Sequence, residues 1–456
     1  MTTMDKLVSL CKRRGFLFPS SEIYGGLGAV YDYGPLGVEL KNNIKKLWWK
    51  TFVQERDDMV GIDSSILMHP NVWEASGHLK SFSDPLIDCK KCHKRFRADH
   101  LVPAEPLVPH VFKEKHVDHR PNACPECGGE LTVARPFNLM FKTFLGPVED
   151  ATSVAYLRPE TAAGMFVNFK QVLDSMHCRL PFGIAQIGKA FRNEITTENF
   201  IFRTREFEIM EFEYFCAPDD APKKFDELLI AMKNFATVLG LHKEKFQDND
   251  KKGKDLAHYS SRTIDLEYAF PFGVKELWGI ANRTDYDLTQ HEKASGQKLQ
   301  YRDPVSGKEF TPHVVEPTFG LDRTMLAVLA EAYEEVPVRS GSEETKKKHD
   351  AEVVLHLPVA LSPIKVAVLP LSKKETLQSE AQAIATTLRK QWMVQYDETG
   401  AIGKRYRRQD EIGTPFCVTV DFETATDKKV TVRDRDTMAQ ERVAIAELVF
   451  YLKEKF

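Results

Sequence analysis

The sequence lacks the features that would place it outside the ordinary globular proteins. No apolar run approaches the roughly 18 residues that a membrane-spanning helix needs, and there is no internal repeat or low-complexity block beyond short charge runs. The first residues carry scattered charges and no apolar core, so a secretory signal is not predicted, and the acidic Asp5 argues against a transit peptide. We therefore expect a cytoplasmic protein without a membrane segment.

The chain also lacks an excess of charge of either sign. It has 63 Lys and Arg against 66 Asp and Glu, a net charge of −3. Any polyanion it binds must therefore meet a local basic patch, because the field of the whole molecule would not attract it. The 42% hydrophobic and 28% charged residues exclude disordered and collagenous classes. At roughly 150 residues per domain, the length of 456 residues predicts several domains.

Cysteine is scarce, and eight cysteines are too few for a disulfide-built scaffold in a chain of this length. Four of them form two CxxC pairs, Cys89 with Cys92 and Cys124 with Cys127. Each pair can point two thiolates at one ion, and Zn²⁺ is the usual occupant of four such sulfurs. We predict a structural zinc with a closed coordination shell. The alternatives are a pair of knuckles without metal, or a redox dithiol, which is disfavoured because neither pair opens a helix in a βαβ unit.

Hydrophobic periodicity predicts regular structure on both sides of this cysteine-containing segment. The expected elements are a helix over 36–53, a strand over 59–68, antiparallel strands over 182–190 and 207–215, a helix over 222–239, a strand over 314–319 and a helix over 322–333. Polar residues at 247–254 and 289–307 predict surface loops. After a charged linker at 334–350, strands and helices alternate up to an expected final helix at 440–455, which predicts a small α/β domain.

Three arginines lie on the predicted antiparallel strands or on the loop between them: Arg192, Arg203 and Arg205. An arginine that faces a cavity costs desolvation unless it meets an anion, and its planar fork suits phosphate or carboxylate oxygens. For a generic strand pair, a solvated ladder of cross-strand ion pairs would be the better interpretation. A fourth arginine, Arg323, stands at a strand-to-helix junction, where backbone N–H groups favour anions. Together these residues indicate an anion site.

The motifs on these elements resemble those of the class II aminoacyl-tRNA synthetases. Residues 191–194 (Phe-Arg-Asn-Glu) resemble motif 2, residues 320–323 (Gly-Leu-Asp-Arg) resemble motif 3, and residues 36–70 resemble motif 1, the dimer-interface element. The finer resemblance is to the dimeric glycyl-tRNA synthetase family and covers nearly the whole chain. It is carried by residues 15–26, 97–100, 157–162, 205–207, 276–281 and 316–318, and by residues 403–408 with Asp421, which resemble a class IIa anticodon-binding domain.

This resemblance implies an α+β fold, in which helices flank a class II antiparallel sheet. The implied domains are the first part of the catalytic domain at 1–88, a zinc-knuckle insertion at 89–136, the rest of the catalytic domain at 137–340, a linker at 341–361 and an α/β anticodon-binding domain at 362–456. It also implies a homodimeric glycine–tRNA ligase that uses ATP with Mg²⁺. Such an enzyme forms glycyl-adenylate and pyrophosphate, and then transfers glycine to the 3′ end of tRNA(Gly).

The activation step brings two anions together, so it needs fixed cations and Mg²⁺ and no nucleophilic side chain. By resemblance, Arg192 holds the α-phosphate and the substrate carboxylate, while Arg203 and Arg323 hold the outer phosphates. Phe207 would stack on adenine, and Glu194 would accept from the adenine amino group. The implied ATP-binding residues are Arg192, Asn193, Glu194, Phe202, Arg203, Phe207, Glu276, Leu277, Gly320 and Arg323. Of these, Arg192, Glu194 and Arg323 are the implied catalytic residues, and Glu276 is the candidate for help with Mg²⁺ or the ribose.

Glycine offers no side chain to recognise, so its site has to hold the ammonium tightly and exclude anything larger. Excess carboxylates suit the first task, and a clash with an added methyl group suits the second. The residues that the resemblance assigns to glycine are Arg97, Glu160, Phe207, Glu211, Glu316, Thr318 and Gly320. Thr318 departs from the family, which usually has serine there. Without the resemblance, a single glutamate in a strand would be interpreted as solvated or salt-bridged.

A basic and aromatic run near the C-terminus is predicted to contact the anticodon loop of tRNA. It contains Lys404, Arg405, Arg407 and Arg408 around Tyr406, although such a run is usually just a solvated face. Two alternatives to the ligase remain. One is a synthetase-like RNA-binding or regulatory protein that has lost catalysis, against which all the motif residues are present. The other is a class IIa enzyme for alanine, serine or threonine, against which the three carboxylates speak. No general base for the transfer step is identified.

Overall fold

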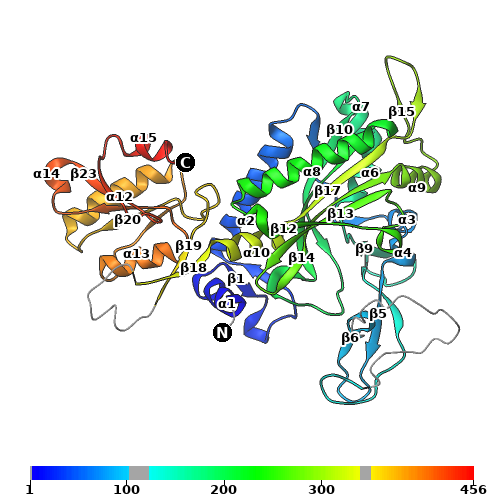
Figure 1. The fold of residues 1–456 in the computed structure, drawn as a ribbon, viewed down its shortest axis with the longest axis horizontal. Helices are drawn as coiled ribbons and strands as arrows, with labels where there is room; N and C mark the ends of the chain where they lie inside the picture. Colours follow the sequence, from blue (N-terminus) through cyan, green and yellow to red (C-terminus); the bar gives the residue numbers. More distant parts are fainter. Residues whose placement is uncertain (1–2, 102–122, 339–350) are drawn as a thin grey trace.

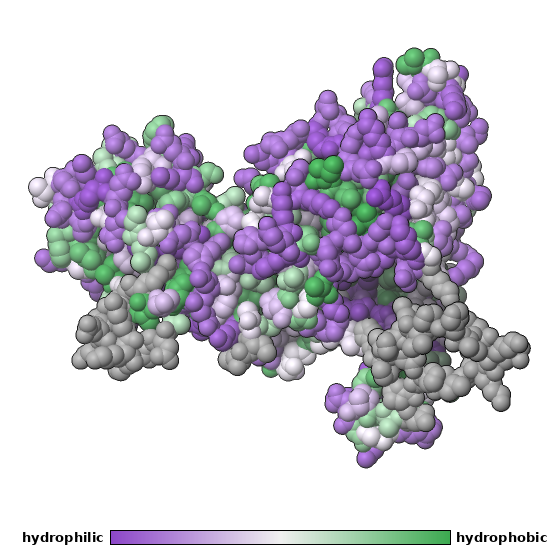
Figure 2. All heavy atoms as spheres, in the orientation of Figure 1, coloured by the Kyte–Doolittle hydropathy of each residue, from purple (hydrophilic) through white to green (hydrophobic). Residues whose placement is uncertain are grey.

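The computed structural model describes residues 3–101, 123–338 and 351–456 (Figure 1). A larger body carries a seven-stranded sheet and a smaller body carries a five-stranded sheet, and the two lie side by side. A third, small sheet projects from the larger body. Most of the face seen in Figure 2 is hydrophilic, with smaller hydrophobic areas on both bodies. Among the described helices, none combines the length and the apolarity needed to cross a membrane.

The seven-stranded sheet is antiparallel except at one edge, where β3 pairs parallel with β10. The order of its strands is β12 (Phe246–Asp250), β13 (Arg262–Phe270), β14 (Gly273–Thr284), β17 (His313–Gly320), β11 (Glu206–Cys216), β10 (Phe182–Phe191) and β3 (Met59–Gly61). The predicted antiparallel pair is confirmed, because β10 and β11 pair over their whole length. The strand predicted at 314–319 is also confirmed, as the central strand β17.

Strand β11 separates the hydrophobic core from a polar space on the other face of the sheet. Its side chains that enter the main core are Met210, Phe212, Tyr214 and Cys216. Because successive side chains of a strand alternate between faces, Glu211 and Glu213 point the other way. Phe215 also points that way and joins a second, smaller core. The same strand therefore supplies apolar packing on one side and carboxylates on the other.

Helices cover both faces of the large sheet. The main core is closed by α2 (Pro35–Trp49), α8 (Ala221–Val238) and α10 (Leu321–Ala332), and all three were predicted within a few residues of these bounds. On α8 the buried residues recur at helical spacing: Phe225, Leu228, Leu229, Met232, Phe235 and Ala236. The second core lies under α6 (Ala162–Val167), α7 (Phe169–Met176) and α9 (Tyr286–Ser295).

Three expectations for the larger body are wrong. The strand predicted at 59–68 is two strands: β3, and β4 (Leu67–Met68), which pairs instead with β9 (Val154–Leu157) in a separate sheet that also contains β8 (Phe141–Phe144). The polar segment 247–254 is not all loop, because its first part lies in β12. This strand is at the edge of the sheet, where its polar Gln247 and Asn249 donate to Glu267 of β13. Polar cross-strand pairs thus take the place of apolar alternation.

The segment 289–307, also predicted as a loop, contains most of α9 and the strand β15 (Tyr301–Arg302), which forms a hairpin with β16 (Glu309–Phe310) just beyond the segment. Of its apolar side chains, Leu299 and Tyr301 are buried and complete the second core, whereas Val305 is exposed. The predicted linker begins with β18 (Tyr333–Val336), which pairs with β19 (Glu352–Leu355). The remainder of that prediction, at 339–350, lies outside the described residues.

The smaller body is the predicted α/β domain. Its sheet has the order β21 (Val394–Tyr396), β20 (Val366–Pro370), β22 (Phe416–Val420), β23 (Lys429–Asp434) and β24 (Gln440–Ala444). The first three strands are parallel, and α12 (Glu375–Arg389) covers one face while α13 (Ile402–Asp410) packs on the other. The expected final helix at 440–455 is corrected to β24 followed by α15 (Leu448–Lys453), because the alternating residues of β24 pair with β23.

The third sheet belongs to the cysteine-containing insertion and has the order β6 (Arg95–Arg97), β5 (Ser83–Asp88) and β7 (Arg135–Asn138). Short helices α3 (Pro70–Ala75) and α4 (His78–Ser81) precede it in the chain, and α5 (Ala98–Leu101) follows β6. Leu86 and Ile87 of β5 are buried, but neither belongs to a hydrophobic core cluster of the described residues. The described part of the insertion therefore has little apolar core of its own.

Candidate active site

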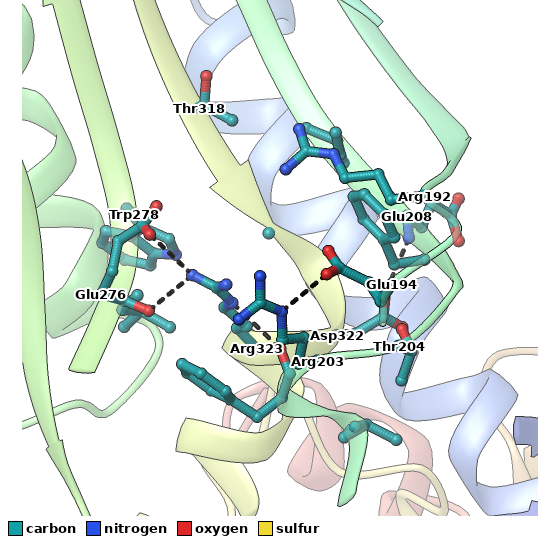
Figure 3. Close-up of a pocket in the computed structure, with 16 residues that line it drawn as sticks. Arg192, Glu194, Arg203, Thr204, Glu208, Glu276, Trp278, Thr318, Asp322 and Arg323 are labelled. Atoms are coloured by element: carbon teal, nitrogen blue, oxygen red, sulfur yellow. Dashed lines mark hydrogen bonds and ion pairs between the residues drawn. The ribbon is translucent and has the colours of Figure 1, made fainter. Parts of the chain in front are cut away.

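A cavity of about 150 Å³ opens on the large sheet where β11, β14 and β17 meet the loop between β10 and β11 (Figure 3). All the residues predicted to bind ATP line it except Asn193, whose backbone N–H donates to the Leu139 carbonyl at 2.8 Å. The lining residues that were not predicted are Ile201, Thr204, Glu208, Ile209, Trp278 and Asp322. Three guanidinium groups from separate segments, those of Arg192, Arg203 and Arg323, lie around the same space in Figure 3.

Arg192 directly follows β10 and is held from two sides. Its guanidinium lies 5.4 Å from the ring centre of Phe82 and 5.3 Å from that of Phe207. The Nε atom donates to the Pro159 carbonyl at 3.1 Å. Because this bond uses one of five N–H donors, the planar group is fixed in orientation and can still bind a further oxygen ligand.

Arg203 and Glu194 face each other across the loop between β10 and β11. Arg203 Nε donates to Glu194 Oε2 at 3.0 Å, and Glu194 is buried. The third arginine of the loop, Arg205, turns away: its guanidinium donates to the backbone carbonyls of Gly28 and Glu194. Of the loop arginines, the structure therefore brings Arg203 to the pocket and uses Arg205 to fix the loop.

Arg323 is the third arginine that lines the pocket, and it lies at the junction of β17 and α10. Its Nη1 donates to the backbone carbonyl of Glu276 at 2.9 Å and lies 3.2 Å from the carboxylate of the same residue. Its Nε donates to the Phe202 carbonyl at 3.2 Å, and the guanidinium lies 4.4 Å from the ring centre of Phe202. Glu276 is exposed at the rim, so its carboxylate meets both the arginine and the open end of the pocket.

A charged network that the sequence did not predict supports the base of Arg323. Asp322 accepts a hydrogen bond from the Tyr33 hydroxyl and another from the Glu208 backbone N–H at 2.7 Å. Lys41 of α2 places its Nζ 2.9 Å from Glu208 and 3.4 Å from Asp322. The network joins the motif 1 helix to the residue next to Arg323. The only hint of this network in the sequence was the aspartate, Asp322, that precedes Arg323 in motif 3.

Beside the pocket, three glutamates of β11 and β17 form a buried cluster. One oxygen of each of Glu211, Glu213 and Glu316 lies within 4.8 Å of the others. Glu211 accepts from the hydroxyls of Thr161 at 2.6 Å and Thr318 at 2.7 Å. Thr318 lies at one end of the pocket in Figure 3. Two residues assigned to glycine by resemblance, Glu211 and Glu316, are thus brought together, and Glu213 was missed although it alternates with Glu211 on the same strand.

A buried arginine balances part of this charge. Arg283, at the end of β14, donates to Glu316 Oε1 at 2.8 Å and to both oxygens of Asp287 at 2.8 and 2.9 Å. Its guanidinium also lies 4.0 Å from the ring centre of Tyr259. Sequence reasoning missed Arg283 and Asp287. The sequence signal that was available is the spacing of four residues between the two. This spacing brings an arginine at the end of β14 close to an aspartate in the first turn of α9.

Glu160 and Arg97 stand at the margins of this arrangement. Glu160 Oε2 lies 3.3 Å from His78 Nε2. Burial raises the pKa of Glu160, but His78, Arg283 and Arg192 outweigh burial and lower that pKa to about 2. Arg97 does not line the pocket. It lies on β6 of the insertion and pairs with Asp84 at 2.5 Å and Asp99 at 2.7 Å.

The four predicted zinc ligands converge in the insertion. Their Sγ atoms all lie within 4.8 Å of one another, with Cys89 and Cys127 at 3.6 Å and Cys92 and Cys124 at 3.8 Å. Sulfurs bound tetrahedrally at about 2.3 Å from one zinc would lie about 3.8 Å apart. The N–H groups of Lys91 and Cys92 donate to Cys89 Sγ, which favours a thiolate. The donor set therefore fits zinc in number, type and spacing.

The predicted RNA-contacting run on α13 is corrected at Arg405. This residue is buried, and its guanidinium donates to the carbonyls of Pro370, Leu371 and Asp397, so it holds the domain together and cannot meet RNA. Arg408 pairs with Asp397 at 2.6 Å. Arg407 pairs with Glu352 of β19 at 2.9 Å, and Lys404 is exposed. A basic run in sequence did not distinguish structural arginines from surface ones.

Comparisons with known proteins agree with this architecture. The model of the tRNA synthetase class II core domain (G, H, P, S and T) matches residues 147–332, and that of the anticodon binding domain matches residues 365–455. A threonyl-tRNA synthetase structure from Cryptosporidium parvum is similar with a TM-score of 0.66 at 18% identity, covering 98% of this chain and 97% of that one. A prolyl-tRNA synthetase structure from the same organism gives 0.63 at 14% identity, covering 99% and 77%. These likenesses show the fold.

The curated relatives are closer in sequence. A glycine–tRNA ligase of Caldanaerobacter subterraneus subsp. tengcongensis is 52% identical, with 99% of this chain and 98% of the relative covered. A glycine–tRNA ligase of Geobacillus thermodenitrificans is 53% identical, with 99% and 97% covered. A chain that aligns with these enzymes over almost its full length, and that carries both domains of a class II synthetase, belongs to the glycine–tRNA ligase family.

Proposed function

We propose that this chain is an active glycine–tRNA ligase, which activates glycine with ATP and then transfers it to the 3′ end of tRNA(Gly). The observation that carries the proposal is the direct junction of two sites. A pocket with three guanidinium groups adjoins a buried carboxylate cluster through Thr318, which lines the pocket and donates to Glu211. The first site suits a polyphosphate and the second suits a small ammonium, so the reacting atoms of the two substrates would meet between them.

In the activation step, the glycine carboxylate attacks the α-phosphate and pyrophosphate leaves. Arg192 would hold the α-phosphate and the attacking carboxylate, since it lines the pocket, acts on the carboxylate of Glu160, and has its orientation fixed by Phe82 and Phe207. Arg203 and Arg323 would stabilise the charge that develops on the leaving pyrophosphate. Charge stabilisation by preorganised cations, with both reactants held in line, is sufficient for this chemistry.

The nucleoside and glycine ends are assigned from the same geometry. Phe207 would stack on adenine, on the ring face that Arg192 does not cover. Glu194 would accept from the adenine amino group while Arg203 holds one of its oxygens. Glu211, Glu316 and Glu160 would surround the glycine ammonium, and Gly320 would leave room at the base of the pocket. Arg97 remains a proposed substrate-side residue, reached from the insertion.

Two metal ions belong to the proposal. Mg²⁺ would enter with ATP and neutralise phosphate charge, with Glu276 at the rim as the protein carboxylate that could face it. Zn²⁺ would occupy the four cysteine sulfurs and hold the insertion together. The spacing of the sulfurs supports the zinc, and its full set of four protein ligands makes its role structural.

The proposed domain division places the catalytic domain at 1–88 and 137–340, the zinc insertion at 89–136, the linker at 341–361 and the anticodon-binding domain at 362–456. We propose a homodimer, supported by three large apolar side chains of motif 1 that are exposed in one chain: Val38, Ile66 and Leu67. A cytoplasmic location is supported by the cysteines, since none of the eight forms a disulfide.

The proposal is tested by amino-acid-dependent exchange of pyrophosphate into ATP with glycine, alanine or serine. We expect exchange with glycine alone, and a loss of at least about a hundredfold in Arg192→Ala, because one positioned transition-state donor is worth that much. Arg302→Ala, an exposed arginine on the β15 hairpin, is the matched control and should leave exchange unchanged. Exchange with alanine or serine would assign another substrate, and no exchange at all would favour a synthetase-like binding protein.

A further inference from the structure

Glu213 is a buried carboxyl group that the chemistry above does not use. Its side chain is fully buried, and neither of its oxygens has a hydrogen-bond partner within the part of the chain that the structure describes. It lies two residues from Glu211 on β11, facing Glu316 of the neighbouring strand β17. A buried polar group without a partner is costly, so this group should either hold a proton or receive a ligand.

The charges that face Glu213 come from every element packed around it. Glu211 lies on its own strand and Glu316 on β17, while Arg283 and Asp287 approach from the end of β14 and from α9. Around this cluster lie Glu160 with its partner His78, the phenol of Tyr259 and the imidazole of His291. Burial lowers the pKa of His291 and raises that of Tyr259, so both are neutral near pH 7.

Negative charge therefore exceeds positive charge in this space. Arg283 is the buried cation that pairs directly with the cluster, and its guanidinium is already shared between Asp287 and Glu316. The buried Arg158 also attracts Glu211, but it is hydrogen-bonded to the carbonyls of Ser64 and Lys189. Glu211 is served by two hydroxyl groups. Carboxylates this close to one another cannot all ionise in a buried site. Burial and the neighbouring Glu316 and Glu211 raise the pKa of Glu213 well above its ordinary value, and burial raises the pKa of Glu316 to about 8.

We propose that Glu213 is a specificity-determining positioning residue: with Glu316 it shares one proton in the empty glycine site, and this proton leaves when the glycine ammonium binds. The inference rests on the proposed glycine site and extends it. In the step, the O–H bond of the carboxylic acid breaks, its electron pair stays on the oxygen, and the proton passes to solvent. The ammonium then replaces the proton as the positive charge between Glu211 and Glu316.

This exchange has two consequences for recognition. Because the cluster is neutralised by a proton when empty, it does not have to bind an inorganic cation in order to be stable. Because the proton competes with the ammonium, the apparent affinity for glycine should rise with pH through the range where the shared proton dissociates. The rise is at most about tenfold per pH unit for one proton. A neutral ligand of similar size, such as acetamide, would not displace the proton.

Isothermal titration calorimetry of glycine binding at pH 7, in buffers of different ionisation enthalpy, measures this proton directly. For the wild-type protein we expect release of up to about one proton per glycine. Glu213→Gln should bind glycine with reduced release, because one of the two carboxyl groups that share the proton is replaced by an amide. Glu331→Gln is the matched control. Glu331 is a half-buried residue of α10 that pairs with Lys245 and does not line the pocket. This variant should therefore release as many protons per glycine as the wild type.

Glycine binding without proton release in the wild type, or equal release in Glu213→Gln, would overturn the inference. If Glu213→Gln does not fold, the wild-type enzyme still provides the test: a glycine affinity that is flat between pH 6 and pH 8 would contradict the shared proton. The proposed function fails in a different way, through the absence of both glycine binding and glycine-dependent exchange.

Discussion

Thr318 occupies the point where the arginine-lined pocket meets the carboxylate cluster. Its hydroxyl donates to Glu211, which also accepts from Thr161, so the extra methyl group relative to serine costs the cluster no hydrogen bond. Threonine can therefore keep the charge recognition of a serine while narrowing the space beside glycine. A difference that looks like a departure in sequence is conservative in the chemistry of the cluster.

Replacement of Thr318 should separate these two roles. Thr318→Val removes the hydroxyl and leaves Glu211 with one donor fewer, which costs about 1–3 kcal/mol, so the KM for glycine should rise by roughly tenfold or more. Thr318→Ser keeps the donor, and the KM for glycine should stay within about threefold. The preference for glycine over alanine should fall in Thr318→Ser, because the methyl group is gone. Pyrophosphate exchange with both amino acids measures these effects, and an unchanged KM in Thr318→Val would contradict the assigned hydrogen bond.

At the level of elements, helix α2 reaches the proposed ATP pocket through Lys41, with the more exposed Lys45 beside it. Lys41 contacts Glu208 of β11 and Asp322 of α10, and Asp322 precedes Arg323 in the chain. The helix that is proposed to carry the dimer interface therefore also supports the orientation of a phosphate-binding arginine. The contact is buried, so solvent screens it less than it screens a surface ion pair.

Lys41→Met should weaken both the fold and the ATP site. Loss of one partner from a buried charge cluster leaves Glu208 and Asp322 unbalanced and should lower the free energy of unfolding by about 3 kcal/mol. The KM for ATP should rise more than the KM for glycine. Lys45→Met is the matched control, since Lys45 pairs with the same Glu208 at 3.2 Å but is more exposed. Denaturant unfolding and exchange kinetics measure the two effects, and equal behaviour of the two variants would rule out the special role of Lys41.

The insertion offers a test at the same scale. Purified protein should contain about one zinc per chain. Cys127→Ser should lose the metal and make the insertion more sensitive to proteolysis, because little apolar packing holds residues 83–101 and 123–138. Cys178→Ser, at a half-buried cysteine outside the cluster, should keep both zinc and resistance. Elemental analysis with limited proteolysis gives the answer, and full resistance after zinc loss would show that the insertion folds without metal.

The elements that sequence reasoning predicted well are those with a strong apolar period, such as α8 and the pair β10 and β11. Where polar contacts replace apolar burial, as in the edge strand β12, the period carries no signal. The site followed the same rule. Residues within contiguous motifs were located, whereas Arg283, Asp287 and Glu213 serve the site from positions whose chemistry depends on neighbours distant in sequence. The predicted RNA contact of Arg405 was wrong for the converse reason. Its partners are backbone carbonyls, and the sequence alone does not reveal such contacts.

At the scale of the whole molecule, the proposed homodimer would form through motif 1. The wild-type protein should sediment at about twice the 52.0 kDa of one chain. Leu67→Arg places a charge among the exposed apolar side chains of motif 1 and should shift the protein toward the monomer. Val305→Arg, at an equally apolar but isolated position on the exposed hairpin, should remain dimeric. Sedimentation of all three proteins at one concentration measures their oligomeric states. A monomeric wild type would exclude the proposed dimer.

The strand order of the large sheet has a consequence for its synthesis. Strand β17 lies between β14 and β11 but is the last of the seven to leave the ribosome. A nascent chain that ends before His313 therefore carries two separate half-sheets, each with an open edge. The motif 3 arginine and Glu316 follow only with β17 and the residues just after it, so the same event closes both edges and completes both substrate sites. An incomplete chain cannot activate glycine, and its open edges are the features that a chaperone would have to shield during translation.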